Sequence, residues 1–168
     1  MSFNNNSPFG NTPEVVKNLL ILNIIGFVAA NLLQARGINL NDLLGLHIPG
    51  GSKFQPYQFI TYLFMHGSLM HIFFNMFALV SFGSIIERYF GAKRFFIFYF
   101  TCGIGAGLLY LLTSYWELQP QLALYGEQLL DMPVAVGASG AIYGLLMAFG
   151  LLFPNAMAIN TREELEEE

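Results

Sequence analysis

Polar and hydrophobic positions segregate along this chain on the scale of whole helices. Four long stretches contain no Asp, Glu, Lys or Arg, and they cover residues 18–35, 54–86, 95–116 and 132–161. A helix needs about 20 mostly apolar residues to cross the hydrocarbon core of a bilayer. These stretches lack the strict alternation of barrel strands, and backbone groups cannot stay unpaired in lipid. We therefore expect an all-α membrane protein with transmembrane helices near residues 15–34, 66–87, 94–115 and 138–154.

The composition agrees with this pattern. Of the 168 residues, 55% are hydrophobic and only 11% are charged, and the mean hydropathy is +0.53. Soluble domains carry about 25% charged residues, so a freely soluble monomer and a disordered chain are both disfavoured. The net charge of −4 arises entirely within residues 162–168. Because the remaining chain is electrically balanced, nothing indicates a nucleic-acid partner.

The cationic residues predict an orientation. The short link between the second and third expected helices holds Arg88, Lys93 and Arg94, whereas residues 117–137 hold no Lys or Arg. By the positive-inside rule the short link is cytoplasmic, and the amino terminus is then cytoplasmic too. The loop 36–58, expected outside, carries two cations that weaken this assignment.

Two polar side chains near the start of the second expected helix share one face. His71 and Asn75 are four residues apart, and both lie in the first turns of the helix. Polar groups inside a bilayer are costly and are functional candidates by default. They could equally be two side chains that hydrogen-bond to neighbouring helices, and both interpretations stay open on this segment alone.

The fourth expected helix begins with a cluster of small residues, Gly137-Ala138-Ser139-Gly140. Ser139 should lie at the amino-terminal end of this helix, where unpaired backbone N–H groups and the helix dipole can stabilise an oxyanion. Simple helix packing is the alternative, because Gly140 and Gly144 form a small-xxx-small face. The two polar groups are expected at the same depth, so Ser139 could converge with His71 and Asn75.

Taken together, the motifs resemble the rhomboid family of intramembrane serine proteases. Residues 137–140 fit the family's G-x-S-G motif, and residues 71–75 fit its H-x-x-x-N motif. Residues 83–91 fit G-x-x-x-E-x-x-x-G, and the three motifs occur in the family's order. Residues 56–58 (Pro-Tyr-Gln) stand where many members carry a Trp-Arg pair, which puts the contacts of that arginine in doubt.

The resemblance implies a polytopic helix bundle and a specific site. Ser139 would be the nucleophile, and the oxyanion hole would comprise His71, Asn75 and the backbone N–H groups of Ala138 and Ser139. Substrates in the family are single-span membrane proteins, cleaved in or near the membrane segment at small residues. No metal or cofactor is implied, and we expect a multi-pass protein of the cell membrane, in contact with lipid.

The resemblance also assigns supporting roles. Gly137 and Gly140 complete the serine motif, and Tyr143 would stack on the catalytic histidine. His66 would hold the first loop, and Glu87 would hold the cytoplasmic end of the second helix.

One departure from the family is large. The catalytic base is a histidine on a sixth helix, and no matching pattern occurs in this sequence. We expect a polar tail at 1–14, an incomplete transmembrane domain at 15–157 and an acidic tail at 158–168. This last segment is interpreted as a truncation, an altered terminus or a fusion scar, with a genuine acidic helical tail as the alternative.

Two functional hypotheses remain. The first is a serine endopeptidase, with this chain inactive by itself unless the missing carboxy-terminal helices act in trans. The second is a non-catalytic membrane protein that binds client transmembrane helices. Retention of Ser139, His71 and Asn75 favours protease ancestry, and the absent base favours inactivity of these 168 residues.

Overall fold

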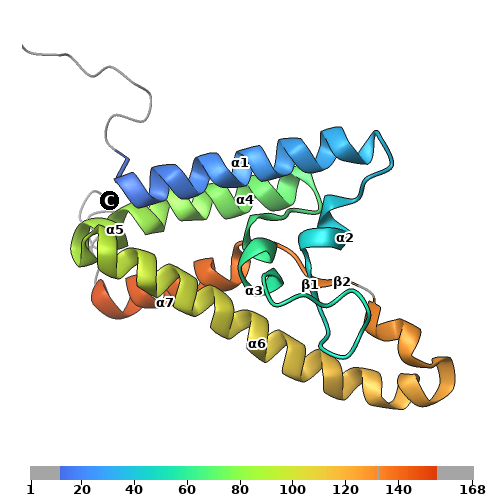
Figure 1. Cartoon of the computed structure of the whole chain (residues 1–168). Coiled ribbons are helices and arrows are strands. Elements are labelled where there is room, and N and C mark those ends of the chain that lie inside the picture. Colours follow the sequence, from blue (N-terminus) through green and yellow to red (C-terminus); the bar gives the residue numbers. More distant parts are fainter. Residues whose placement is uncertain (1–11, 132, 155–168) are drawn as a thin grey trace, which may run out of the picture.

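The computed structural model describes residues 12–131 and 133–154 as a bundle of helices (Figure 1). The expected acidic tail at 158–168 and nearly all of the expected polar tail lie outside the described residues. In chain order the elements are α1 (Glu14–Gln34), α2 (Leu40–Leu44), β1 (Leu46–His47), α3 (Gln58–Thr61), η1 (Tyr62–Phe64), α4 (Leu69–Ala78), η2 (Leu79–Gly83), α5 (Ser84–Phe90), α6 (Ala92–Tyr125), η3 (Glu127–Asp131), β2 (Pro133–Ala135) and α7 (Ser139–Leu152).

Within residues 12–131 and 133–154, three helical segments are long and apolar enough to cross a bilayer. They are α1, the continuous helix Leu69–Phe90 formed by α4, η2 and α5, and the apolar part of α6. The fourth, α7, has 14 residues. Figure 1 shows α1 lying along α4, with α6 and α7 forming the other side of the bundle. The predicted class, a helical membrane bundle, is confirmed.

The second helix begins later than the sequence predicted. Its first residue is Leu69, because the side chain of Ser68 accepts a hydrogen bond from the backbone N–H of His71 at 3.2 Å and caps the helix. His66 therefore precedes the helix, which begins within one turn of the start predicted near residue 66. Between α4 and α5 the helix widens into a π-helical segment, which no sequence feature indicated.

The third helix is much longer than predicted. α6 has 34 residues, which corresponds to about 50 Å of helix, whereas the hydrocarbon core is about 30 Å thick. It continues through Pro120 to Tyr125, so the link predicted at 117–137 begins as helix. The end of α6 extends past the rest of the bundle before the chain turns back toward α7 (Figure 1).

Small residues bring α6 and α7 into close contact. A Cβ atom at Gly140 would lie 2.5 Å from the Cβ of Ala106, and one at Gly144 would lie 2.5 Å from the Sγ of Cys102. Real Cβ atoms do not approach other atoms so closely, so only glycine permits this crossing. The predicted small-xxx-small packing face is thus confirmed, and it fixes the position of the adjoining Ser139.

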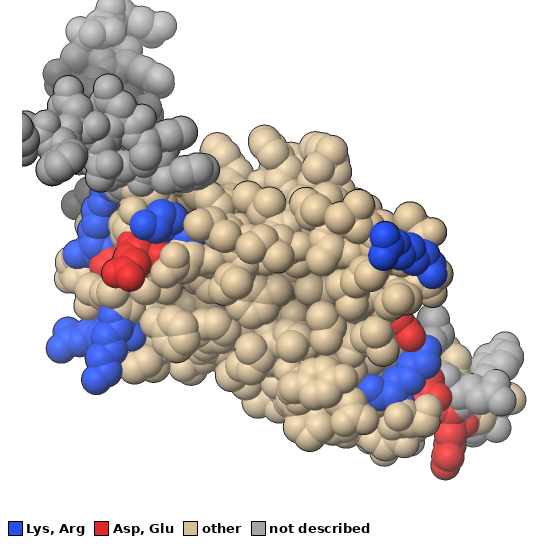
Figure 2. Space-filling view, turned by 45° about the horizontal axis from the view of Figure 1, so that its top comes forward, with Lys and Arg blue, Asp and Glu red and all other residues tan. Residues whose placement is uncertain are grey.

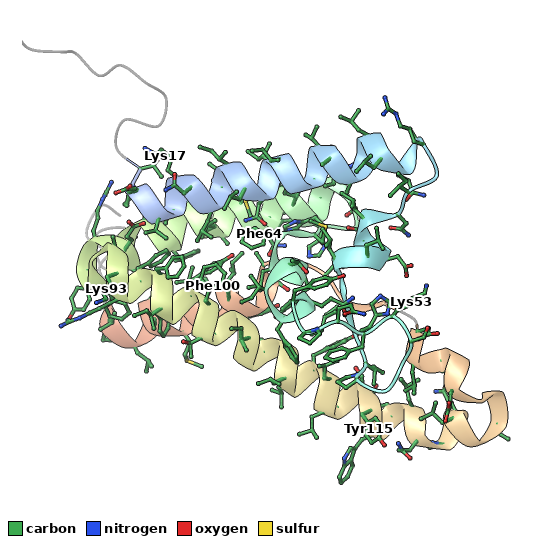
Figure 3. All side chains as sticks on the ribbon, viewed as in Figure 1. Lys17, Lys53, Phe64, Lys93, Phe100 and Tyr115 are labelled. Carbon is green, nitrogen blue, oxygen red and sulfur yellow. The ribbon has the colours of Figure 1, made fainter. Side chains whose placement is uncertain are left out.

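Aromatic and aliphatic side chains fill the space between the helices. The described core includes Phe95, Tyr99 and Leu145, all fully buried. Phe64 and Phe100 face each other across the bundle, with ring centroids 6.3 Å apart. Figure 3 shows this pair between the charged ends, which are marked by Lys17 and Lys93 on one side and Lys53 on the other.

Gln58 organises the first loop by using all of its hydrogen-bonding capacity. Its Oε1 accepts from the backbone N–H groups of His47 and Gln55, at 3.2 and 3.1 Å. Its Nε2 donates to the carbonyl oxygens of Leu43 and Lys53, at 3.3 and 3.0 Å. A neutral amide therefore holds the loop at the position where the resemblance led us to look for an arginine.

Glu87 joins the second helix to the first. Its carboxylate accepts hydrogen bonds from the backbone N–H groups of Val15 at 3.0 Å and Val16 at 2.8 Å. These are first-turn donors of α1, which have no acceptor within their own helix. The negative charge also lies at the positive end of the α1 dipole, and Glu87 is only 4% exposed.

We predict that Glu87→Ala destabilises the bundle by about 2 kcal/mol, because it removes two hydrogen bonds to a charged group. Thermal unfolding in detergent micelles, followed by circular dichroism, measures the change. Glu14→Ala is the matched control, since Glu14 lies in the same first turn of α1 but is exposed. Equal destabilisation by the two variants would contradict the assignment.

Candidate active site

Gly137 controls how the chain enters α7. Its φ angle of +118° lies in a region that residues with a side chain avoid. Its backbone N–H donates to the carbonyl oxygen of Tyr62 at 2.8 Å, which ties the turn to η1. Ala138 follows fully buried, and Ser139 is the first residue of the helix. The serine therefore lies where the backbone N–H groups of the first turn have no helical acceptor.

The side chains of His71 and Asn75 lie against this same turn. A Cβ atom at Gly137 would be 2.7 Å from both Cε1 and Nε2 of His71, and 3.7 Å from Nδ2 of Asn75. The absence of a side chain at Gly137 is what leaves room for the imidazole. The structure thus brings His71 and Asn75 of the H-x-x-x-N motif against Gly137, which lies two residues before Ser139 in the G-x-S-G motif.

The amide of Asn75 is a buried donor without a partner. Asn75 is 6% exposed, and its Nδ2 has no acceptor among the described residues. Two asparagines of α1 behave differently, because Asn23 and Asn31 each donate to the carbonyl four residues earlier, at 2.8 Å. Buried polar groups are nearly always hydrogen-bonded, so an unpaired amide beside the serine turn is a candidate for binding a reacting group.

His66 packs against His71 from outside the helix. The ring centroids are 5.0 Å apart and the rings meet edge to face at 65°. His66 is 1% exposed, and neither ring nitrogen has a hydrogen-bond partner in the part of the chain described. Burial, with a smaller effect from His71, lowers the pKa of His66 to about 4. At neutral pH the imidazole of His66 is therefore uncharged, and it packs against the ring of His71, which in turn lies against Gly137.

A cavity of about 340 Å³ opens at Ser139. Residues of three segments line it, among them Ser139, Gly137, Gly140, Tyr62, Ala106 and Tyr110. None of the lining residues is charged. The cavity reaches Gly137, on which His71 packs, so a group placed in it would lie between the serine and the turn that holds the polar pair.

Tyr143 is the last of the predicted site residues to be placed, and His47 is the third histidine of the chain. Tyr143 is 72% exposed, and its stacking on a catalytic histidine stays a prediction, because that histidine would come from a helix outside these 168 residues. Its exposed neighbours along α7 are Met147 and Leu151, at 66% and 74%. His47 is fully buried in the first loop, with Nε2 2.7 Å from the carbonyl oxygen of Asp42. Within residues 12–131 and 133–154, no group of three or more His, Cys, Asp or Glu side chains could hold a metal ion.

Tyr62 is the site residue that the sequence did not reveal. Its carbonyl accepts the hydrogen bond from Gly137, its ring lines the cavity, and its hydroxyl donates to the carbonyl of Gly103 at 2.5 Å. It lies in an apolar run of the first loop, and nothing in that run distinguishes it from a core aromatic. Tyr62 reaches this position only because η1 packs against α6 in the folded chain.

Comparison with known proteins agrees with this geometry. The family model of the Rhomboid domain matches residues 53–162, more than half of the chain. The chain is 39% identical over 93 residues to Rhomboid protein 1, mitochondrial, of Saccharomyces cerevisiae, which covers 55% of this chain and 24% of that protein. It is 27% identical over 127 residues to Rhomboid-like protease 3 of Toxoplasma gondii, and this match covers 76% of this chain and 42% of that protein.

A bacterial protein is also similar. Rhomboid protease AarA of Providencia stuartii is 33% identical over 86 residues, covering 51% of this chain and 30% of that protein. In each of these three comparisons the matched region spans less than half the length of the relative.

We predict that acid destabilises the protein through His66. Because the folded-state pKa is about 4 and the ordinary value is 6.5, the unfolded chain takes up a proton that the folded chain excludes. Stability is therefore full above pH 6.5 and falls as the pH drops toward 4, by about 3 kcal/mol at most. Unfolding midpoints in detergent at several pH values measure this loss. His66→Gln, which does not titrate, should show less of it, and an identical pH profile would refute the prediction.

Proposed function

This chain belongs to the rhomboid family, and from that premise we propose that it carries the nucleophile and oxyanion hole of an intramembrane serine endopeptidase. The observation that supports this most directly is the pairing of His71 and Asn75 with the turn at Gly137. An unpaired buried amide and an imidazole meet a helix start that bears a serine.

The proposed reaction begins with attack of the Ser139 hydroxyl oxygen on the scissile carbonyl. The carbonyl oxygen becomes an oxyanion, which accepts hydrogen bonds from the Asn75 amide, from His71 and from the backbone N–H groups of Ala138 and Ser139. The serine proton passes to a base, which then protonates the leaving amine. Water hydrolyses the resulting acyl-enzyme by the reverse exchange of protons.

The base is proposed to be a histidine outside these 168 residues. The chain has three histidines. His47 is buried in the first loop beside Asp42. His66 packs against the ring of His71, and His71 lies against Gly137, where it is proposed to donate to the oxyanion. A base must come within about 2.6–3.2 Å of the serine hydroxyl, and none of these side chains is assigned that place. Further membrane helices, in the same polypeptide or in trans, would supply it.

The proposed substrates are single-span membrane proteins. The cavity at Ser139 is lined by uncharged residues, most of them small, so the backbone of a substrate segment can approach the hydroxyl, and the family resemblance implies cleavage at small residues. Ser139 is the first residue of α7 and lines this cavity, through which water for hydrolysis would enter.

The protein is a multi-pass membrane protein, and its orientation is part of the proposal. Figure 2 shows charged side chains at the two ends of the molecule and an uncharged band between them. Lys17, Lys93 and Arg94 lie at the end proposed to face the cytoplasm of a cell membrane. Arg36, which follows α1, and Lys53 lie toward the opposite end (Figures 1 and 3), whereas α7 begins near the middle of the bundle.

One observation favours a second candidate, the binding of client helices without cleavage. Tyr143, Met147 and Leu151 form an exposed apolar stripe on α7, next to the serine. A client helix could pack on this stripe whether or not it is cut. Retention of a single-span client by the wild-type protein, with no cleavage, would favour this candidate over the protease.

We predict that Ser139→Ala abolishes cleavage of a single-span substrate. The assay uses proteoliposomes containing the natural protein that bears these residues, together with any further helices it possesses. Cleavage should fall to background because the attacking oxygen is gone. Ser81→Ala, a serine of η2 away from the cavity, should leave the rate unchanged. Undiminished cleavage by Ser139→Ala would remove Ser139 from the mechanism.

We predict that Asn75→Ala lowers kcat about 100-fold, the usual effect of losing one oxyanion-hole donor. KM should change little, because the amide binds charge that develops only in the transition state. Asn31→Ala is the control, since the amide of Asn31 is exposed and bonded to its own helix. A rise in KM at constant kcat would show that Asn75 binds substrate instead.

A further inference from the structure

A separate cavity lies on α6 between the serine cavity and the amino-terminal, cationic end of that helix. It is a groove of about 390 Å³ lined by Phe90, Arg94, Ile97, Phe98 and Thr101. The last four residues are spaced three and four apart, so they lie along one face of α6. Phe90 closes the side of the groove from the neighbouring helix α5.

The wall of this groove is built by aromatic packing. The rings of Phe90 and Phe98 meet edge to face, with centroids 5.6 Å apart and an interplanar angle of 79°. Ile97 is 54% exposed, so the groove is open to whatever surrounds α6. Because α6 is long and apolar enough to span the bilayer, that surrounding is the acyl region of the membrane.

Arg94 gives the groove a charged end. It is the one charged lining residue, it is exposed, and none of the described residues forms an ion pair with it. The nearest carboxylate along the chain, that of Glu87, is already occupied by the N–H groups of Val15 and Val16. Arg94 is two residues into α6, where a helix that spans the membrane meets the headgroups.

We propose that this groove binds one phospholipid of net negative charge, with its phosphate on the guanidinium of Arg94 and one acyl chain along Ile97 and Phe98. Seven residues separate Arg94 from Thr101, which is about 10 Å of helix. One leaflet of the hydrocarbon core is about 15 Å thick. The groove thus accommodates most of the depth of one acyl chain below a phosphate held at the surface.

The headgroup, not the acyl chain, accounts for selectivity. Lipid tails are as apolar as the side chains of the groove, so any chain would fit with little net gain. A guanidinium, in contrast, forms paired hydrogen bonds to phosphate oxygens and attracts a net negative headgroup. Phosphatidylglycerol should therefore be preferred over phosphatidylcholine, whose own cation offsets the phosphate charge.

Quenching of a tryptophan placed in the groove tests the site. The chain has one tryptophan, Trp116, which is 76% exposed near the other end of α6. A Trp116→Phe, Phe98→Trp variant is reconstituted in vesicles that mix plain lipid with brominated phosphatidylglycerol or brominated phosphatidylcholine. We expect brominated phosphatidylglycerol to occupy the groove about fivefold more strongly than phosphatidylcholine, the effect typical of one basic residue.

Two further substitutions in this background distinguish a site from general surface charge. Arg94→Gln should abolish the preference, while Lys93→Gln should retain it, because Lys93 is adjacent and equally charged but does not line the groove. Circular dichroism checks that each variant keeps its helix content. Equal quenching by the two lipids, or equal loss of preference in both substitutions, would overturn the proposal.

Discussion

The site depends on the absence of a side chain at Gly137. The imidazole of His71 occupies the space that a Cβ atom would need, and the φ angle of +118° at this residue directs the chain into α7. The hydrogen bond to the carbonyl of Tyr62 then fixes the turn against the first loop. Any side chain at Gly137 would push the serine helix away from the helix that bears His71 and Asn75. Steric contact at one residue therefore joins three segments that are distant in sequence.

The surrounding membrane determines how much an unpaired polar group costs. In water, an amide without a protein partner simply binds solvent, but inside a bilayer such a group is costly. The Nδ2 of Asn23 lowers this cost by donating to its own helix, although the Oδ1 of Asn23 has no partner among the described residues. The Nδ2 of Asn75 and both ring nitrogens of His66 also remain unpaired there. These groups lie on either side of His71. Tight packing of α6 on α7 holds the arrangement together despite this cost, because Gly140 and Gly144 allow the helices to touch.

Much of the fold could be predicted because a charged side chain in lipid is expensive, so charge-free runs mark the helices that span the membrane. The same reasoning could not find the end of α6, which continues through Glu117 and Pro120. Once a helix has left the hydrocarbon, charged residues and proline are tolerated in it, so they do not mark its end. The π-helical segment η2 leaves no mark in composition. At the site, His71, Asn75 and Ser139 were predicted from spacing and motif. The roles of Tyr62 and Gln58 were not predicted. They arise from tertiary contacts of the first loop, and the sequence of that loop does not distinguish these two residues from their neighbours.

The two ends of the bundle differ in how they treat charge. At the end that carries the first loop, Lys53 pairs with Asp42 at 2.9 Å, and Ser52 donates to Asp131 of η3 at 2.8 Å, which lowers the pKa of that carboxyl. The cavity at Ser139 is lined by uncharged residues. At the opposite end the carboxylate of Glu87 is turned inward to the α1 backbone, and it leaves the cations of α6 to face the headgroups. The acidic groups at the two ends thus differ in their partners, because Asp42 pairs with a lysine, whereas Glu87 accepts hydrogen bonds from the backbone of α1.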